Sequence, residues 1–309
     1  MRNVFIKTLT KLAPKHPEIF LIVGDLGYGV IEEFAQKFPR QFLNAGIAEQ
    51  NMTGMAAGLA LSGKTIFTYS IANFPILRPL EQVRNDICYH NANVKIVSVG
   101  GGFFYHSLGS THHGTEDISI MRTLPNMTVL APGDAYEAEC ATRALIEHSG
   151  PCFLRLTKAP ESTVHTKKPA FKIGKAIQIG NGSDVALITT GGMLEETIKT
   201  AEFLKRQKIS ARVISMHTVK PLDAAIIKKT AREVKAIATI EDHQITGGLG
   251  SAVAEGLAET SPSAILFKRF GIPDIFIKHI GSVEYIKEKL GLTAEKLSKK
   301  IQTFLAHDI

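Results

Sequence analysis

The chain has 309 residues, of which hydrophobic residues make up 44% and charged residues 21%, a balance typical of a globular protein long enough for two domains. The formal net charge is +7, but Lys and Arg are spread along the sequence and Trp is absent, so a nucleic-acid-binding stripe with stacking aromatic residues is disfavoured. No apolar run is as long as a membrane span, and the first residues lack the apolar core and cleavage site of a secretory signal.

The first part of the chain alternates short β-rich segments with helical patterns. An amphipathic helix is predicted at the N-terminus, where Val4, Phe5, Leu9 and Leu12 recur at helical spacing. Because strands separated by helices form parallel sheets covered on both faces, residues 1–160 predict one α/β domain. The predicted strands are Ile19–Val23, Thr65–Tyr69, Val94–Val99, Thr128–Leu130 and Cys152–Leu156, and further helices are predicted near 47–61, 75–91 and 134–148.

A linker is predicted over residues 161–175, because the segment 158–175 carries Pro160, Pro169, Ser, Thr and Lys with weak periodicity. The alternation of strands and helices then restarts and predicts a second α/β domain over 176–309. Its predicted strands are Val185–Thr190, Ala211–Met216, Ala236–Ile240 and Ile265–Arg269, and its predicted helices are Met193–Gln207, Leu222–Arg232, Gly250–Glu259 and segments near 282–290 and 293–306.

The cysteines and one acidic pair have structural interpretations. Cys88, Cys140 and Cys152 lack the spacing of a metal or redox site, so we interpret them as buried free thiols in a reducing cytoplasm. Asp242 and His243 precede a glycine-rich turn and a helix. Such a helix N-terminus can bind an anion, but we favour close helix–sheet packing as the reason for the glycines.

Glu49 stands at the start of a small-residue helical segment, NAGIAEQNMTGMAAGLALS over 44–62. Apolar residues recur there at three- and four-residue steps, so one face is buried and Glu49 lies at its edge. Glu is rarely buried without a partner, and a carboxylate with apolar neighbours can hold a proton near neutrality. A first-turn Glu also stabilises the helix dipole, so the helix alone leaves a structural and a catalytic role open.

The run GIAEQ, followed by AAGLALSGKTIFTYS and GSTHHGTED, resembles the pyrimidine-binding domain of thiamine diphosphate enzymes, above all transketolase and 1-deoxyxylulose-5-phosphate synthase. The resemblance covers nearly the whole chain but only the C-terminal half of those longer enzymes. It implies two three-layer α/β/α domains, a pyrimidine-binding domain and a transketolase C-terminal-like domain. In the family, the Glu that matches Glu49 hydrogen-bonds the N1′ ring nitrogen of the cofactor's aminopyrimidine, which activates the cofactor to attack a ketose carbonyl.

The resemblance also assigns roles to other residues. Phe74, or instead Tyr69 or Phe67, would stack on the aminopyrimidine ring. His112 matches the histidine that faces the reacting hydroxyls of the sugar, and its ordinary pKa suits proton transfer. The further candidates for substrate binding are His113, which replaces an amide of the family motif, Lys158, which replaces a phosphate-binding Arg, and Arg78.

Departures from transketolase bear on the substrate. The Asp that contacts the C2 hydroxyl of the sugar donor is replaced by Leu108, an upstream His by Gly100 and a phosphate-binding Ser by Gly29. The residues that the resemblance assigns to the chemistry, Glu49 and His112, are therefore kept, while residues that bind the sugar phosphate in transketolase are replaced. Gly100 also opens a Gly-Gly-Gly run, which marks a turn or a close backbone approach.

The Gly-Asp-Gly run that holds the diphosphate and Mg²⁺ in the family is missing, so no metal site is assigned to this chain. The leading hypothesis is therefore the C-terminal subunit of a split transketolase. Such a subunit would use thiamine diphosphate and Mg²⁺ together with an N-terminal partner subunit, in an α2β2 assembly that acts on sugar phosphates. The β subunit of a 2-oxoacid dehydrogenase, which has the same domain order, and a non-catalytic partner-binding half are the alternatives. No nucleic acid or membrane partner is expected.

Overall fold

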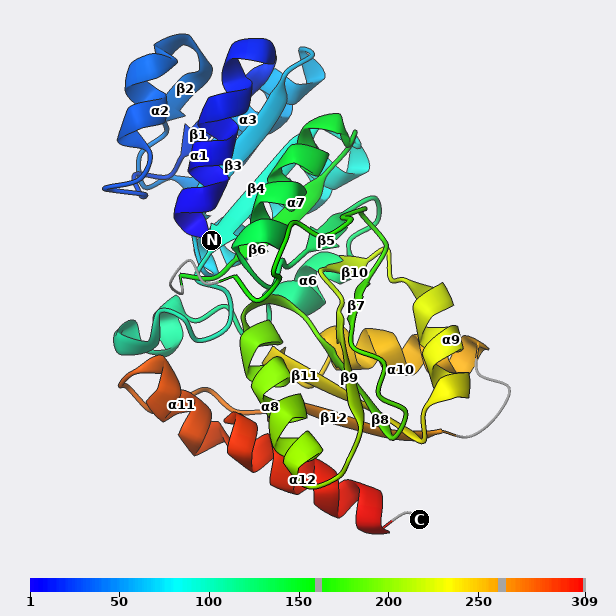
Figure 1. Cartoon of the computed structure of the whole chain (residues 1–309). Helices are drawn as coiled ribbons and strands as arrows, with labels where there is room; N and C mark the ends of the chain where they lie inside the picture. The colour runs from blue at the N-terminus through cyan, green and yellow to red at the C-terminus, as the bar shows by residue number, and fades with distance from the viewer. Residues whose placement is uncertain (159–162, 261–264, 308–309) are drawn as a thin grey trace.

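The computed structural model describes residues 1–158, 163–260 and 265–307. Within these ranges the strands form two sheets, and helices cover both faces of each (Figure 1). The predicted fold class, two α/β domains with parallel sheets, is confirmed. We call the part built around the first sheet the first unit and the part built around the second sheet the second unit.

The first sheet has seven strands in the order β10-β5-β6-β4-β3-β1-β2, and all its pairs are parallel except β10 with β5. The strands are β1 (Ile19–Val23), β2 (Phe42–Asn44), β3 (Thr65–Ile71), β4 (Val94–Val99), β5 (Thr128–Leu130), β6 (Cys152–Leu156) and β10 (Thr218–Lys220). Its helices are α1 (Arg2–Leu12), α2 (Glu32–Lys37), α3 (Glu49–Leu61), α4 (Phe74–Leu77), α5 (Leu80–Gln82), α6 (Asp117–Thr123) and α7 (Ala135–Glu147).

Alternate residues of these strands face opposite layers. Leu21 and Val23 of β1 pack with α1, α2 and α7, whereas Ile22 packs with α3 and the segments after β3. Both faces of the sheet are therefore apolar, which is why its strands read as continuous hydrophobic runs rather than as alternating ones.

The second sheet has five strands in the order β12-β11-β8-β9-β7, with β7 antiparallel at its edge. The strands are β7 (Ile177–Ile179), β8 (Val185–Thr189), β9 (Ala211–Ser215), β11 (Ala236–Gln244) and β12 (Leu266–Ile272). The helices are α8 (Leu194–Arg206), α9 (Ala224–Glu233), α10 (Leu249–Thr260), α11 (Val283–Leu290) and α12 (Ala294–His307). Helices α8, α11 and α12 pack on one face and α9 and α10 on the other (Figure 1).

Strand β10 was not predicted, and it joins the two units. It follows β9 in sequence, yet it pairs with β5 of the first sheet, Thr218 opposite Leu130 and Lys220 opposite Val129. The Lys220 ammonium also donates hydrogen bonds to the carbonyl oxygens of Arg122 and Leu124 at 3.0 and 2.5 Å. The first sheet is therefore completed by residues from the second half of the chain.

The single helix predicted over 75–91 is wrong. The structure has α4 (Phe74–Leu77), α5 (Leu80–Gln82) and a π-helix over Val83–Tyr89. Pro79 has no N–H to continue an α-helix, which explains the break between α4 and α5. As a consequence α4 is a short turn, and it presents its residues at the carboxyl end of β3.

The predicted linker is attached to its surroundings at several points, and residues 161 and 162 lie outside the described residues. The backbone N–H groups of Val164 and His165 donate to the Asp134 carboxylate at 3.0 and 3.2 Å. The ring of Phe171 stacks on His217 with 4.0 Å between centroids. This segment is thus packed against both units.

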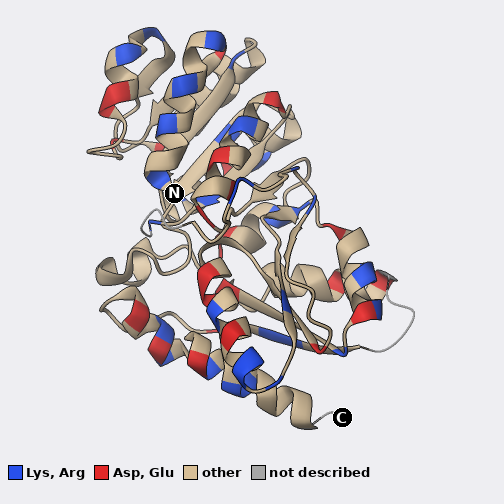
Figure 2. Cartoon of the chain, viewed as in Figure 1, with Lys and Arg blue, Asp and Glu red and all other residues tan. Residues whose placement is uncertain are grey.

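The distribution of basic residues and the state of the cysteines can be compared with the expectations from the sequence. Lys and Arg are scattered over both units instead of gathering on one element (Figure 2). Cys88, Cys140 and Cys152 are unpaired; Cys88 and Cys152 are buried as predicted, whereas Cys140 is only partly buried. Burial raises the pKa of Cys88 and Cys152 to about 11. In the described part of the chain, no helix is long and apolar enough to cross a membrane.

Candidate active site

Glu49 is the first residue of α3, at the carboxyl ends of β1 and β3, and only 4% of it is exposed. One carboxylate oxygen, Oε1, accepts a hydrogen bond from Nη1 of Arg78 at 2.7 Å. The carboxylate borders an open depression of about 500 Å³ lined by Ile47, Ala48, Glu49, Gln50, Asn51 and Arg78. A buried carboxylate thus faces a space that a ligand can enter.

Phe74 and Arg78 lie beside this carboxylate. The guanidinium carbon of Arg78 is 3.9 Å from the centre of the Phe74 ring, a cation–π contact that the four-residue spacing along a helical turn allows. The edge of the His112 ring meets Phe74 with 5.2 Å between centroids. The structure therefore brings Glu49, Phe74, Arg78 and His112 together, although they come from three separate segments.

The row continues from His112 to Lys158 through Tyr105. The rings of His112 and Tyr105 are 6.4 Å apart, and the Lys158 ammonium lies 4.6 Å from the centre of the Tyr105 ring. Tyr105 is a residue that the sequence did not single out. Its position in the loop just after the three glycines was the only available signal.

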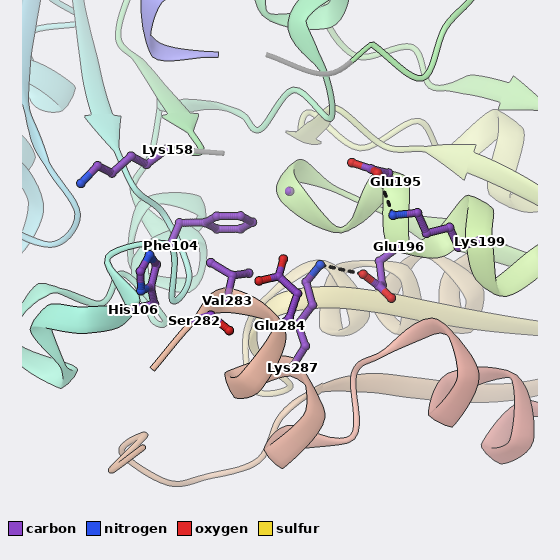
Figure 3. Close-up of a pocket in the computed structure, with 11 residues that line it drawn as sticks. Phe104, His106, Lys158, Glu195, Glu196, Lys199, Ser282, Val283, Glu284 and Lys287 are labelled. Carbon is purple, nitrogen blue, oxygen red and sulfur yellow. Dashed lines mark hydrogen bonds and ion pairs between the residues drawn. The ribbon is translucent and has the colours of Figure 1, made fainter. Parts of the chain in front are cut away.

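Lys158 also lines a cavity of about 700 Å³ between the two units. Lys158, Phe104 and His106 form the side belonging to the first unit, and residues of α8 and α11 form the other (Figure 3). Two ion pairs stand on that second side, Lys199 with Glu195 at 2.7 Å and Lys287 with Glu196 at 2.6 Å. Lys158 thus contacts the Tyr105 ring and also borders this cavity.

His113 is 3% exposed, and neither ring nitrogen has a hydrogen-bond partner among the described residues. Burial, with the nearby charges of His112 and His106, lowers the pKa of His113 to about 4. His113 is therefore neutral near pH 7. A buried polar group of this kind is normally hydrogen-bonded, so both ring nitrogens of His113 keep an unused capacity for a hydrogen bond.

The loop that carries both histidines is held from two sides. The Asn73 side-chain amide donates to the carbonyl oxygens of Thr111 and His113 at 3.4 and 3.2 Å. Gly100 has φ of +89°, and a Cβ there would lie 2.1 Å from the Tyr105 ring. The close approach expected at the glycine run is thus present, and the Tyr105 ring fills the space beside Gly100.

Tyr69 does not join this row. Its side chain is 1% exposed and packs on Phe5 of α1, with ring centroids 6.3 Å apart. Phe67 is also fully buried and contacts the same Phe5 ring at 5.9 Å. Of the three candidate stacking rings, Phe74 alone belongs to the row that includes Glu49. Leu108, at the end of the short turn His106–Leu108, is half exposed.

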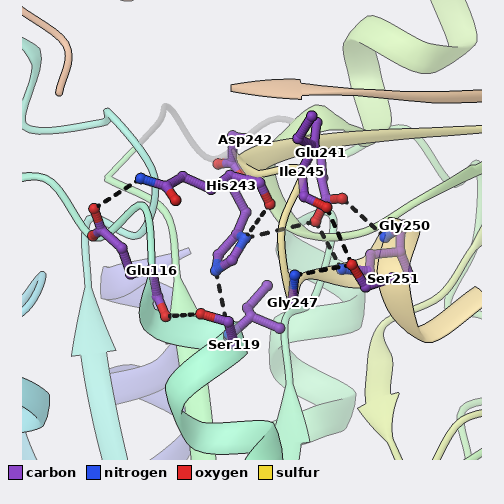
Figure 4. A network of polar contacts seen from close by, with 12 residues as sticks. Glu116, Ser119, Glu241, Asp242, His243, Ile245, Gly247, Gly250 and Ser251 are labelled. Atoms are coloured by element: carbon purple, nitrogen blue, oxygen red, sulfur yellow. Dashed lines mark hydrogen bonds and ion pairs between the residues drawn. The ribbon is translucent and has the colours of Figure 1, made fainter. Parts of the chain in front are cut away.

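Asp242 and His243 belong to a buried network that joins the units (Figure 4). Arg155, at the end of β6, donates to Asp117 at 2.7 Å and to Asp242 of β11 at 2.6 Å. The His243 Nδ1–H donates to the carbonyl oxygen of Gln244 at 2.7 Å, while Nε2 accepts from the backbone N–H of Ser119 at 3.2 Å. Burial, with the Arg155 charge, lowers the pKa of His243 to about 4.

The N-terminus of α10 already holds a carboxylate. Glu241 accepts hydrogen bonds from the backbone N–H groups of Leu249 and Gly250 at 2.7 and 2.9 Å. A Cβ at Gly248 would lie 2.2 Å from this carboxylate, so the glycine permits close packing, in agreement with the favoured interpretation. Burial raises the pKa of Glu241 to about 8 in spite of the hydrogen bonds.

Comparison with known proteins decides the family. Residues 1–160 match the pyrimidine-binding domain of transketolase, and residues 174–297 match the transketolase C-terminal domain. The chain belongs to the transketolase family. Among the described residues, no three His, Cys, Asp or Glu side chains are grouped in a way that could hold a metal ion.

The most similar relatives include subunits of split transketolases. The 6-deoxy-6-sulfo-D-fructose transketolase subunit SqwH of a Clostridium species is 37% identical, covering 96% of this chain and 92% of the relative. A subunit of the apulose-4-phosphate transketolase of Phocaeicola vulgatus is 36% identical, covering 98% and 97%. A solved split-gene transketolase, described as an inactive β4 tetramer, superposes with a TM-score of 0.89 at 35% identity, covering 99% of this chain and 97% of that one.

Proposed function

We propose that this chain is the C-terminal subunit of a thiamine diphosphate-dependent enzyme that transfers a two-carbon ketol unit between sugars. It supplies Glu49, and an N-terminal partner subunit supplies the site for the diphosphate and Mg²⁺. The observation that carries the proposal is the contiguous row of Glu49, Phe74 and His112 beside an open depression.

The residues fit the cofactor's aminopyrimidine. Arg78 shows that Glu49 and Phe74 together hold a flat group with N–H donors, one by a hydrogen bond and the other by its ring face. An aminopyrimidine is a flat heterocycle with ring and amino nitrogens, and the same two contacts suit it. In the proposed complex, Glu49 holds a proton at a ring nitrogen, and Phe74 fixes the plane of the ring.

Bound thiamine diphosphate supplies a nucleophilic carbon for cleaving the bond beside a ketose carbonyl. His112 lies next to the stacking ring and exchanges protons with substrate hydroxyls. His113 stays neutral and hydrogen-bonds the substrate through a ring nitrogen. Lys158, at the far end of the row, holds an anionic group of the sugar as a point charge.

Two observations support the proposal that a partner subunit is needed. No Gly-Asp-Gly run is present in the sequence, so the diphosphate and the metal need another source of ligands. The solved split-gene relative, which contains β chains only, is described as inactive. We expect an α2β2 assembly in the cytoplasm, where the unpaired cysteines would remain reduced.

The substrate is expected to be an unusual sugar. The relatives named above are transketolase subunits named for 6-deoxy-6-sulfo-D-fructose and for apulose 4-phosphate. Both names describe sugars with an anionic group, which suits Lys158. The 2-oxoacid dehydrogenase alternative gains no support from the matched domains, and the non-catalytic alternative is disfavoured by the contiguous row.

Reconstitution tests the proposal. The chain is purified alone and together with a thiamine-diphosphate-binding N-terminal subunit from the same source, and ketol transfer is assayed with thiamine diphosphate and Mg²⁺. We expect turnover only from the pair. Full activity of either subunit alone, or formation of a stable pair that transfers no ketol unit from any sugar, would argue against the proposal.

A further inference from the structure

Arg78 makes two contacts in this structure, and both engage groups assigned to the cofactor. Its Nη1 donates to the Glu49 carboxylate at 2.7 Å, and its guanidinium carbon lies over the Phe74 ring, 3.9 Å from the centroid. A guanidinium is flat and carries N–H donors at its edge, as a protonated aminopyrimidine does. Arg78 therefore satisfies the same hydrogen-bond acceptor and the same aromatic face that an aminopyrimidine would use.

The two partners of this ion pair differ in their freedom to move. The Glu49 side chain is 3% exposed and belongs to the first turn of α3, whereas the Arg78 side chain is 44% exposed and follows the short helix α4. A carboxylate buried to this degree needs a partner at all times. The arginine can reach solvent by rotating its side chain, so it is the partner that can leave.

We propose that Arg78 occupies the aminopyrimidine position in the free subunit and competes with the cofactor for Glu49 and Phe74. This inference rests on the proposed function and concerns the same site. Arg78 keeps the buried carboxylate paired until the ring replaces it, and the guanidinium then rotates out toward solvent. The role differs from that of a substrate-binding arginine, which would leave cofactor affinity unchanged or improve it.

Thiamine is the probe for the test, because it carries the aminopyrimidine but no diphosphate, so the binding measurement does not depend on a partner. Its affinity for the full chain is measured by ligand-observed NMR. We expect Arg78→Leu to bind thiamine about tenfold more tightly than the unmodified chain, since a competing cation–π contact and a charged hydrogen bond are removed. Arg78→Lys keeps the charge without the flat group and should lie between the two.

Arg84 provides the matched control. It is an exposed arginine in the adjacent π-helix, and its side chain bonds only the neighbouring Asn85 among the described residues, at 2.7 Å. Arg84→Leu should therefore leave thiamine affinity unchanged. Circular dichroism confirms folding, and if Arg78→Leu does not fold, Arg78→Gln, which can still donate to Glu49, replaces it with a smaller expected gain.

Chemical rescue gives a second readout that a purely structural role would not move. In Arg78→Ala, free guanidinium at a non-denaturing concentration should refill the position and weaken thiamine binding, while it leaves the unmodified chain unaffected. Equal or weaker thiamine binding by Arg78→Leu, including no detectable binding, overturns the inference. If Glu49→Ala also binds thiamine as the unmodified chain does, the pyrimidine site itself, and with it the proposed function, is wrong.

Discussion

Glu49 has the most consequential side chain in the site, because its buried carboxylate faces the depression where the ring of the cofactor is expected. In Glu49→Ala, no group remains to hold the proton at the ring nitrogen. We expect turnover of the reconstituted pair to fall by about 10² to 10⁴, the usual contribution of a positioned acid or base. Steady-state kinetics with saturating cofactor measures the loss.

Folding of the Glu49 variant is the control for this prediction. Unchanged circular dichroism and unchanged pairing with the partner would show that the loss is chemical. Turnover close to that of the unmodified pair would return Glu49 to a helix-start role.

Arg155 is the residue on which the junction between the two units depends. It is 1% exposed and pairs with the buried carboxylates of Asp117 and Asp242. Arg155→Met leaves these carboxylates without their cation, so we expect the free energy of unfolding to fall by about 3–5 kcal/mol. Urea unfolding measures the difference.

Arg143→Met is the matched control, because Arg143 forms an exposed pair with Glu139 on α7. Its loss should change the free energy of unfolding by about 1 kcal/mol or less. Similar effects of the two substitutions would mean that the buried network contributes no more than a surface pair.

Some candidate site residues could be identified from short sequence motifs, whereas others could be identified only from the geometry of the fold. Glu49 and His112 could be found from the sequence, because short motifs surround them. Phe74 was ambiguous, since three aromatic residues lay at suitable distances, and burial separates them here. The link through Tyr105 depends on the path of a loop, which side-chain periodicity does not encode.

At the scale of elements, His243 connects β11 to α6 as a neutral side chain. Its pKa is about 4 in the folded chain, below the ordinary value of 6.5, so the unfolded chain binds more protons between these values. The stabilisation that comes from this site is therefore complete above pH 6.5 and is lost as the pH decreases toward 4. Denaturant unfolding across this range measures the slope.

His243→Gln removes the proton uptake at this site and should flatten that slope. His113 and His148, whose pKa values are also lowered, still contribute to what remains. A slope that is the same in His243→Gln and in the unmodified chain would assign the acid sensitivity to other groups.

The loop between β4 and α6 is expected to control the choice of sugar. Leu108 replaces an Asp that the transketolase resemblance assigns to the C2 hydroxyl, and a hydroxyl held by a buried polar group is discriminated strongly. We therefore expect xylulose 5-phosphate to be a poor donor, or ribose 5-phosphate to be replaced by another acceptor aldehyde. A panel of ketoses and aldoses, compared by kcat/KM, measures the preference.

Leu108→Asp extends this test, since it should raise kcat/KM for xylulose 5-phosphate relative to other donors. If the ordinary pentose phosphates already give the highest kcat/KM with the unmodified pair, the substitutions at Leu108 and Lys158 are neutral for specificity.

Strands were easier to predict than helix breaks. All nine predicted strands are present, because each contains an apolar run; most are buried on both faces, whereas β12 is partly exposed. Helix 75–91 was predicted as one element because its apolar spacing is continuous, whereas Pro79 divides it. Strand β10 is a three-residue segment whose partner lies about ninety residues away, a distance over which local pattern carries no information.

For the whole molecule, we expect weak cofactor binding. In the proposed complex this chain contacts only the ring of thiamine diphosphate, since its sequence has no Gly-Asp-Gly run for the diphosphate and Mg²⁺. Calorimetric titration of the chain alone with both ligands should show no tight stoichiometric binding, whereas the pair should bind. Tight binding without a partner would refute the half-enzyme hypothesis.

The fold class followed from the alternation of strands and helices, and the family comparison supports it. The boundaries 1–160 and 176–309 stay a prediction. Composition predicted a linker between them. It could not show that strand β10, which follows the linker, returns to the first sheet and pairs with β5, because this pairing depends on tertiary packing.

Strand β10 has a practical consequence for dividing the protein. A fragment that ends at residue 160 would lack Thr218–Lys220, and the backbone donors and acceptors of Thr128–Leu130 in β5 would be left open along one sheet edge. Open edges of this kind recruit strands from other molecules. Expressing the pyrimidine-binding half by itself should therefore give aggregates, and a fragment that supplies its own capping strand should remain in solution.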